Sequence, residues 1–130
     1  MSQCLRLLIV DDEENVLTTL KRVFRGKSFE VSTAPGGEQG LAILIEREID
    51  VIISDMRMPE MDGAEFLARS RTIQPNCRRI LLTGYSDEES LKRAVSEGRI
   101  HQFLGKPWSN DELRKTVMEE WELKLAGDDS

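Results

Sequence analysis

The chain has 130 residues, of which 39% are hydrophobic and 32% are charged, as is ordinary for a globular protein of one domain. Its formal charge of −6, from 18 basic and 24 acidic residues, argues against nucleic acid or an anionic membrane as a direct partner. No apolar run approaches the length of a membrane span or a signal peptide. Cys4 and Cys77 lack metal-ligand spacing, so we expect reduced thiols in a cytoplasmic protein.

Apolar runs of strand length alternate along the chain with stretches of helical period. Strands are predicted at 5–10, 29–34, 51–55, 80–83 and 102–104. The apolar helix faces that follow them are Val16, Leu17, Leu20, Val23 and Phe24; Leu41, Leu44 and Ile45; Ala64, Phe66 and Leu67; Leu91, Ala94 and Val95; and Leu113, Val117, Trp121 and Leu125. Ser109 and Glu112 form a capping box that opens the last helix. These five βα units predict an α/β fold, a doubly wound parallel sheet with helices on both faces.

Three further side-chain interpretations follow from the same pattern. The basic cluster around the turn 72–76 is interpreted as a solvated loop; its members are Arg69, Arg71, Arg78 and Arg79. Phe103 is expected in the core, because it lies within the short fifth strand. Trp121 is also expected in the core, whereas for Leu125 a core position and a partner contact are equally consistent with the sequence.

Polar residues follow the predicted strands, where the carboxyl ends of a parallel sheet bring ligands together. Asp11 and Asp12 follow the first strand, and Asp55 ends the third, which is otherwise apolar. Thr83 ends the fourth strand and Lys106 follows the fifth. Carboxylates gathered in this way repel one another unless a cation compensates. An all-oxygen set suits a hard divalent ion, and few protein ligands favour Mg²⁺ over Ca²⁺.

A carboxylate nucleophile, a divalent ion, a lysine and a hydroxyl together indicate phosphoryl transfer onto an aspartate. Asp55 is the best candidate nucleophile because it stands alone on the central strand. Asp11 and Asp12 are better placed as metal ligands. Taken alone, the acidic run 11–14 would be read as a helix N-terminus favoured by the helix dipole.

Four motifs in order resemble the receiver domain of bacterial two-component response regulators: LLIVDDEENV, VIISDMRMPEMDG, ILLTGYSD and FLGKPWSNDEL. The resemblance covers residues 5–125, and residues 126–130 are expected to be a disordered tail. It implies a flavodoxin-like (βα)5 fold with strand order 2-1-3-4-5. The chain ends soon after this region, so it either acts alone or is a fragment of a longer protein.

The resemblance also implies roles for individual residues. Asp55 would take a phosphoryl group from the phosphohistidine of a sensor histidine kinase or a phosphotransfer protein. Asp12 and Asp55 would bind Mg²⁺ with the backbone carbonyl of Arg57, and Asp11 would act largely through water. Lys106 would contact the phosphoryl group, and the peptide bond that follows it is typically cis in the family.

The switch that the family implies is a rearrangement around the new phosphate. Thr83 would move toward it, and Phe103 would turn inward into the vacated space. The surface of the fourth helix, fifth strand and fifth helix would change and control an output domain or effector; a homodimer is a further candidate assembly. Such a domain promotes its own phosphorylation and dephosphorylation but is not a turnover enzyme.

The sequence departs from the common pattern at Arg57, Tyr85 and Gly105, and it leaves other functions open. Arg57 and Tyr85 are bulky residues at variable positions that flank the path of attacking water, which predicts slow hydrolysis of the phosphoryl group. A degenerate receiver that acts only as a scaffold is one alternative. A phosphatase of the haloacid dehalogenase type is another, although it requires an aspartate where Arg57 stands. A flavin carrier of the same fold would place phosphate against four acidic residues.

Overall fold

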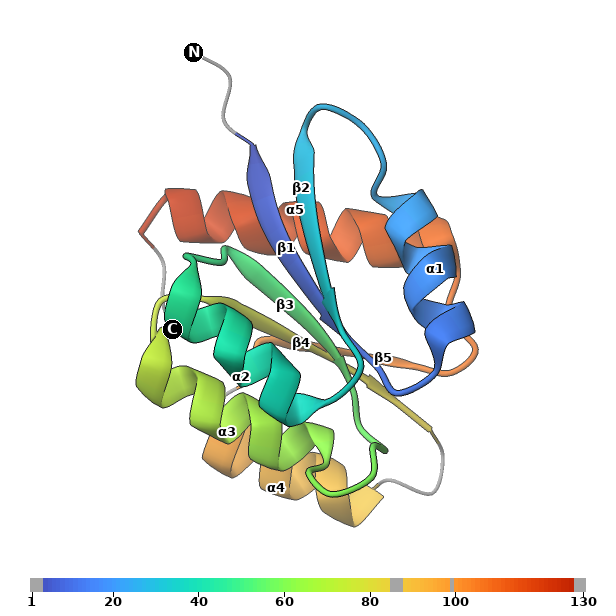
Figure 1. Ribbon diagram of the computed structural model, residues 1–130, viewed down its shortest axis with the longest axis vertical. Helices are drawn as coiled ribbons and strands as arrows, with labels where there is room; N and C mark the ends of the chain where they lie inside the picture. Colours follow the sequence, from blue (N-terminus) through green and yellow to red (C-terminus); the bar gives the residue numbers. More distant parts are fainter. Residues whose placement is uncertain (1–3, 85–87, 99, 128–130) are drawn as a thin grey trace.

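A computed structural model of the chain describes residues 4–84, 88–98 and 100–127 (Figure 1). The strands are β1 (Leu5–Val10), β2 (Phe29–Ala34), β3 (Val51–Asp55), β4 (Arg78–Thr83) and β5 (Gln102–Gly105). The helices are α1 (Glu14–Val23), α2 (Gly37–Glu46), α3 (Gly63–Ile73), α4 (Glu88–Gly98) and α5 (Asn110–Leu125). The strands pair in parallel in the order β2-β1-β3-β4-β5, which confirms the predicted α/β fold and its strand order.

Helices cover both faces of the sheet, α1 and α5 on one side and α2, α3 and α4 on the other (Figure 1). Each face has its own apolar core. Leu8, Val10, Ile52 and Leu81 point to the side of α2 and α3, together with Phe66 and Leu67. Leu7, Ile9, Ile53 and Leu82 point to the other side, with Leu20, Leu113 and Val117. Every residue of β3 and β4 is buried, which is why the sequence of these strands lacks polar alternation.

The strand β4 begins two positions earlier than predicted, because two arginines are part of it. Arg78 and Arg79 are only 4% and 2% exposed, so their interpretation as a solvated loop was wrong. Arg78 pairs with Glu120 of α5, its Nη2 atom lying 2.8 Å from Oε1, and Gln102 donates to the other carboxylate oxygen at 3.1 Å. Paired, hydrogen-bonded charges can be buried where a single charge cannot. Cys77, which directly precedes this strand, is buried as well.

Exposure of apolar side chains separates the correct core predictions from the incorrect ones. Phe103 is 52% exposed, so its core placement was wrong, and Ile45 of the second predicted helix face is 72% exposed. Val95 is likewise exposed on α4. Trp121 packs against the core between the sheet and α5, as predicted, and Leu125 is 52% exposed.

The helices α3 and α5 each begin with a side-chain cap. Ser109 accepts a hydrogen bond from the backbone N–H of Glu112 at 2.9 Å, as the capping box predicted. Asp62 does the same for Glu65 at the start of α3, also at 2.9 Å. Within the described residues, none of the helices combines the length and the apolar character that a membrane span needs.

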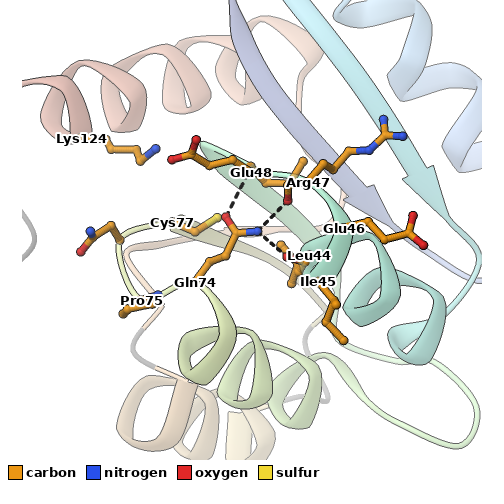
Figure 2. A pocket seen from close by; sticks show the side chains of 11 residues that line it. Leu44, Ile45, Glu46, Arg47, Glu48, Gln74, Pro75, Cys77 and Lys124 are labelled. Carbon is orange, nitrogen blue, oxygen red and sulfur yellow. Dashed lines mark hydrogen bonds between the residues drawn. The ribbon is translucent and has the colours of Figure 1, made fainter.

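A pocket at the amino edge of the sheet is organised by one glutamine (Figure 2). The side-chain nitrogen of Gln74 donates to the carbonyls of Leu44 and Arg47 at 2.7 and 2.8 Å, and its oxygen accepts from the backbone of Ile49 at 3.0 Å. These bonds satisfy carbonyls at the end of α2 and tie it to the end of α3. The edge is therefore built for rigidity and lies opposite the polar residues predicted to form a site.

Gly63 fixes the distance between α3 and the end of β3. A Cβ atom on this residue would lie 2.3 Å from the carbonyl oxygen of Asp55 and 2.9 Å from the Cα of Met56. Its backbone N–H donates to the Met56 carbonyl at 2.7 Å, closing the loop after β3. Only glycine allows this approach, so Gly63 holds the loop that borders the predicted site.

We predict that Gly63→Ala lowers the free energy of unfolding by about 1–3 kcal/mol, because backbone atoms must move to admit the methyl group. Gly105→Ala is the matched control, since no atom lies within 4 Å of the methyl group it would introduce. Urea denaturation of both variants measures the difference. Equal stabilities of the two would contradict the packing described for Gly63.

Candidate functional site

Asp55 ends the central strand β3 with its carboxylate almost fully buried, at 3% exposure. Strand pairing holds its backbone, because Asp55 is in register with Leu82 and the next backbone N–H, that of Met56, donates to the Leu82 carbonyl at 3.0 Å. Gly63 holds the other side, as described above. The side chain is therefore delivered to the carboxyl edge of the sheet by a rigid strand, as the sequence predicted.

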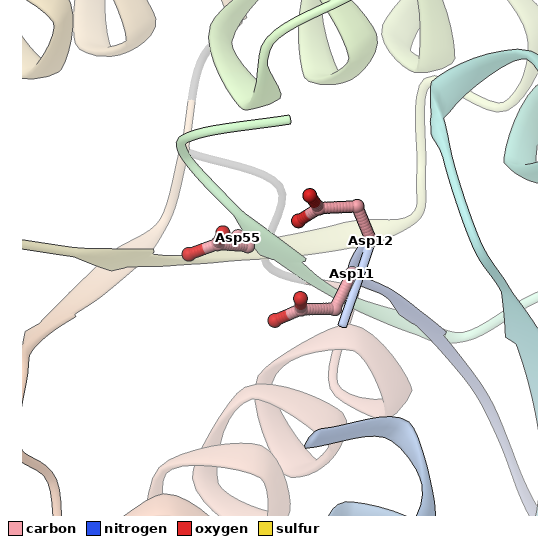
Figure 3. A group of neighbouring side chains, drawn as sticks. All are labelled: Asp11, Asp12 and Asp55. Carbon is pink, nitrogen blue, oxygen red and sulfur yellow. The ribbon is translucent and has the colours of Figure 1, made fainter. Parts of the chain in front are cut away.

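Asp11 and Asp12 follow β1 and lie beside Asp55 (Figure 3). Each of the three residues offers a carboxylate oxygen, and these oxygens lie within 4.8 Å of one another. Asp11 is 2% exposed, whereas Asp12 is exposed to solvent. One Asp11 oxygen accepts a hydrogen bond from the backbone of Glu13 at 2.9 Å, which orients its carboxylate before α1 begins.

Lys106 supplies the positive charge of the site. Its ammonium nitrogen lies 2.5 Å from Oδ1 of Asp55, while its backbone N–H donates to the carbonyl of Thr83 at 2.8 Å. This ion pair places the ammonium against a buried carboxylate oxygen. The peptide bond between Lys106 and Pro107 is cis, as the resemblance implied.

Burial governs the electrostatics of these carboxylates. Burial raises the pKa of Asp11 to about 6. The hydrogen bond from the Glu13 backbone lowers this pKa in part, and repulsion from the Asp55 charge raises it further. Burial also raises the pKa of Asp55, and the Lys106 charge opposes this shift without cancelling it. Burial alone would lower the pKa of Lys106, but its contact with Asp55 outweighs that effect and the pKa is raised. The site is thus short of positive charge.

This donor set fits a hard divalent cation. The three carboxylates offer oxygen ligands only, and they come from two rigid strand ends. Among the described residues, the buried Asp55 carboxylate has the Lys106 ammonium at Oδ1 as its counter-charge, and a cation among the three carboxylates would supply a second. The donor set agrees with the Mg²⁺ that the resemblance to receiver domains implied.

Thr83 and Phe103 border a hollow next to the acidic group. The hollow has a volume of about 410 Å³ and is lined by Thr83, Gly84, Leu91, Phe103, Gly105, Lys106 and Pro107. Thr83 is buried, and its hydroxyl donates to the carbonyl of Gly84 at 3.3 Å. Phe103 lies on the open side of this space, half of its surface in solvent.

Of the two residues predicted to flank the path of attacking water, the structure describes Arg57 but not Tyr85. Arg57 follows the buried end of β3 by two positions and is exposed at the border of the site. Tyr85 lies outside the described residues. Sequence reasoning missed two contributors, Gly63 and Leu91; the glycine that closes the loop after Asp55 was a signal for the first, and the apolar face of α4 for the second.

Comparison with known proteins places this geometry in a family. Residues 7–118 match the response regulator receiver domain. The hydrogenase transcriptional regulatory protein HoxA of Cupriavidus necator is 37% identical over 123 residues, which are 94% of this chain and 25% of that protein. The chain thus spans about a quarter of the transcriptional regulators it matches. Sporulation initiation phosphotransferase F of Bacillus subtilis is 33% identical over 92% of this chain and 95% of that protein.

Solved structures agree with the sequence matches. The signal receiver domain of an HD domain-containing protein from Pseudomonas fluorescens Pf-5 superposes with a TM-score of 0.91 at 33% identity, covering 95% of this chain and 99% of that one. A response regulator receiver domain from Clostridium thermocellum gives 0.86 at 31% identity, covering 94% and 98%. The fold, the acidic edge and these matches agree, and the chain belongs to the response regulator receiver domain family.

Proposed function

We propose that this domain is a phosphorylatable switch in which Asp55 accepts a phosphoryl group. The donor would be the phosphohistidine of a sensor histidine kinase or a phosphotransfer protein, and the domain would act in the cytoplasm, where such donors present this group. The observation that carries the proposal is the Asp55 carboxylate, 3% exposed, with the Lys106 ammonium 2.5 Å from one oxygen. We propose the receiver unit to span residues 5–125.

The transfer needs little from the protein beyond placement and charge. A carboxylate oxygen of Asp55 would form a bond to phosphorus while the bond between phosphorus and the histidine nitrogen breaks, its electron pair remaining on the nitrogen. The Lys106 ammonium, already against this carboxylate, would compensate the negative charge of the phosphoryl oxygens. Because β3 is rigid and its neighbours are packed, the nucleophile would not have to be repositioned.

Three carboxylates and one carbonyl would hold the metal. Asp12 and Asp55 would bind Mg²⁺ with the backbone carbonyl of Arg57, and Asp11 would act largely through water. When bound, Mg²⁺ would neutralise the acidic group and polarise the phosphoryl oxygens. The raised pKa values of Asp11 and Asp55 support this assignment, since they show that the protein alone leaves both charges undercompensated.

Phosphorylation would be read out on the surface of α4, β5 and α5. A phosphate brings about two negative charges, and the Thr83 hydroxyl stands at the edge of the same hollow as Lys106 and Phe103. Movement of Thr83 toward the phosphate would free space for Phe103, whose ring is half in solvent. Val95 on α4 is exposed near this face, so burial of Phe103 would change an apolar surface available to an output domain, an effector or a second copy.

The rival functions lack supporting contacts. A haloacid dehalogenase type of phosphatase would need an acid at the position of Arg57. A phosphorylation-independent scaffold would not need the buried carboxylates, whose gathering is electrostatically unfavourable. Self-catalysed phosphorylation and dephosphorylation, without turnover of another substrate, is the activity that the arrangement supports.

Incubation with acetyl phosphate and Mg²⁺ is predicted to add one phosphoryl group, seen by intact mass spectrometry. Asp55→Asn should remove the added mass, because the amide is a poor nucleophile, and chelation of Mg²⁺ should do the same. Absence of any added mass with Mg²⁺ present would favour the scaffold instead.

The phosphoryl group of the wild-type domain is predicted to outlast that of an Arg57→Asn, Tyr85→Ala double variant by about tenfold, which is ~1.4 kcal/mol in the barrier to hydrolysis. The reason is that both bulky residues flank the path of water. Loss of the added mass over time after removal of acetyl phosphate measures both rates. Equal half-lives would show that these two side chains do not control access.

Asp11→Asn is predicted to raise the free energy of unfolding by about 1–3 kcal/mol at pH 7.5 without Mg²⁺, because it removes a buried charge whose pKa is raised to about 6. The folded state holds the Asp11 proton more tightly than the unfolded state, so the wild-type penalty is full above pH 6. It should shrink as the pH falls from 6 toward 4, and urea denaturation across that range measures it. A gain that did not depend on pH would contradict this origin.

A further inference from the structure

A groove between α1 and the edge strand β2 has no role in the proposed phosphoryl transfer. Its volume is about 390 Å³, and its lining residues are Thr18, Lys21, Arg22, Phe24, Arg25, Phe29 and Val31. Among the described strands, β2 pairs only with β1 and ends the sheet on this side. The groove lies on the face of this end strand that α1 covers, since its lining residues Phe29 and Val31 pack toward the same core as Leu20 and Phe24.

The rim of the groove carries unpaired positive charge. Lys21, Arg22 and Arg25 are exposed on it, and Lys27 follows in the same turn. None of these four makes an ion pair within the part of the chain that the structure describes. The domain as a whole is acidic, with a formal charge of −6, so this surface stands out against its surroundings.

Helix stability explains only part of this cluster. Lys21 and Arg22 lie in the last turn of α1, where cations favourably oppose the helix dipole. Arg25 and Lys27 lie beyond the helix and gain nothing comparable from it. Arg114 of α5 brings another cation close, since its guanidinium stacks over the Phe29 ring at 5.2 Å and donates to the Val23 carbonyl at 2.8 Å.

The floor of the groove is apolar and preformed. Phe24 is buried and meets Phe29 edge to face, with ring centroids 5.4 Å apart. Phe29 and Val31 are half-buried, so part of each side chain faces the groove. An occupant would thus find an apolar floor for a side chain and cations around it.

We propose that this groove docks an acidic segment of a partner protein, with an apolar side chain on Phe29 and Val31 and carboxylates toward Arg22 and Arg25. A nucleic acid fits less well, because its phosphate backbone would gain nothing from the apolar floor that Phe29 and Val31 provide. The segment would end before the start of α1. A neighbouring hollow there is lined by Asp12 and Glu14, whose carboxylates would repel an acidic segment. The docking does not depend on phosphorylation of Asp55.

The probe for this proposal is a fluorescein-labelled peptide in which glutamates flank one leucine and one phenylalanine, titrated at low ionic strength with fluorescence anisotropy as the readout. Arg22→Glu with Arg25→Glu is expected to raise the dissociation constant roughly tenfold or more. Lys92→Glu with Lys115→Glu is the matched control, because it makes the same change in net charge at exposed positions outside the groove and should leave binding within about twofold of wild type. Val31→Thr keeps the shape, removes apolar character from the floor, and should weaken binding by roughly threefold.

Amide chemical shifts in the wild-type domain give a second readout, and changes confined to residues 18–31 would support the proposal. Equal losses in the groove and control variants would overturn it, because binding would then follow net charge alone. The proposal would also be overturned if a peptide with serine in place of its leucine and phenylalanine bound as tightly as the original peptide. The same holds for a single-stranded DNA of similar charge. Either result would show that the apolar floor does not contribute to the choice of ligand. Oligomerisation of the domain with no peptide bound, if Arg22→Glu with Arg25→Glu abolished it and Lys92→Glu with Lys115→Glu did not, would overturn the proposal by assigning the groove to a second copy.

Discussion

The contact between the partly exposed Lys106 side chain and the buried Asp55 carboxylate is the constraint on which the rest of the site depends. It joins the ends of two strands that are not neighbours, β3 and β5, across β4. A carboxylate at 3% exposure needs a counter-charge, and the lysine ammonium provides one at Oδ1. Three carboxylates against this one ammonium leave an excess of negative charge at the carboxyl edge. A domain that holds such an excess is prepared to receive a cation and a group bound with it.

The two edges of the sheet have opposite character. At the amino edge, buried ion pairs fix α5: Glu120 pairs with Arg78, and Lys124 lies 2.6 Å from an oxygen of Asp50. At the carboxyl edge, the hollow beside Thr83 is open, and the aromatic ring on its border is half exposed. A change at Asp55 would therefore be taken up at the carboxyl edge, where packing leaves room, while the far half of α5 stays anchored.

The sequence predicted those features that apolar periodicity alone determines. It predicted less well the burial of side chains that depends on a partner elsewhere in the chain. The convergence of Asp11, Asp55 and Lys106 follows from apolar periodicity and parallel topology, whereas the order of the strands was predicted from the resemblance to receiver domains. The start of β4 was missed because arginine favours solvent until a buried partner is known, and Glu120 lies far along the chain. Phe103 was misplaced because an aromatic residue in a strand is usually core, whereas β5 is an edge strand with one side open to solvent.

A crystal structure of the domain with Mg²⁺ and beryllofluoride, a mimic of the phosphoryl group, tests the central claim most directly. We predict beryllium bonded to an Asp55 oxygen, the metal among Asp11, Asp12 and Asp55, and Lys106 and the Thr83 hydroxyl in contact with fluoride. Phe103 should be more buried than its present 52% exposure. The contrary result would be a structure, obtained with both ligands at saturating concentration, in which Asp55 remained paired only with Lys106. That result would contradict the account, since the acidic edge would then serve some purpose other than phosphoryl transfer.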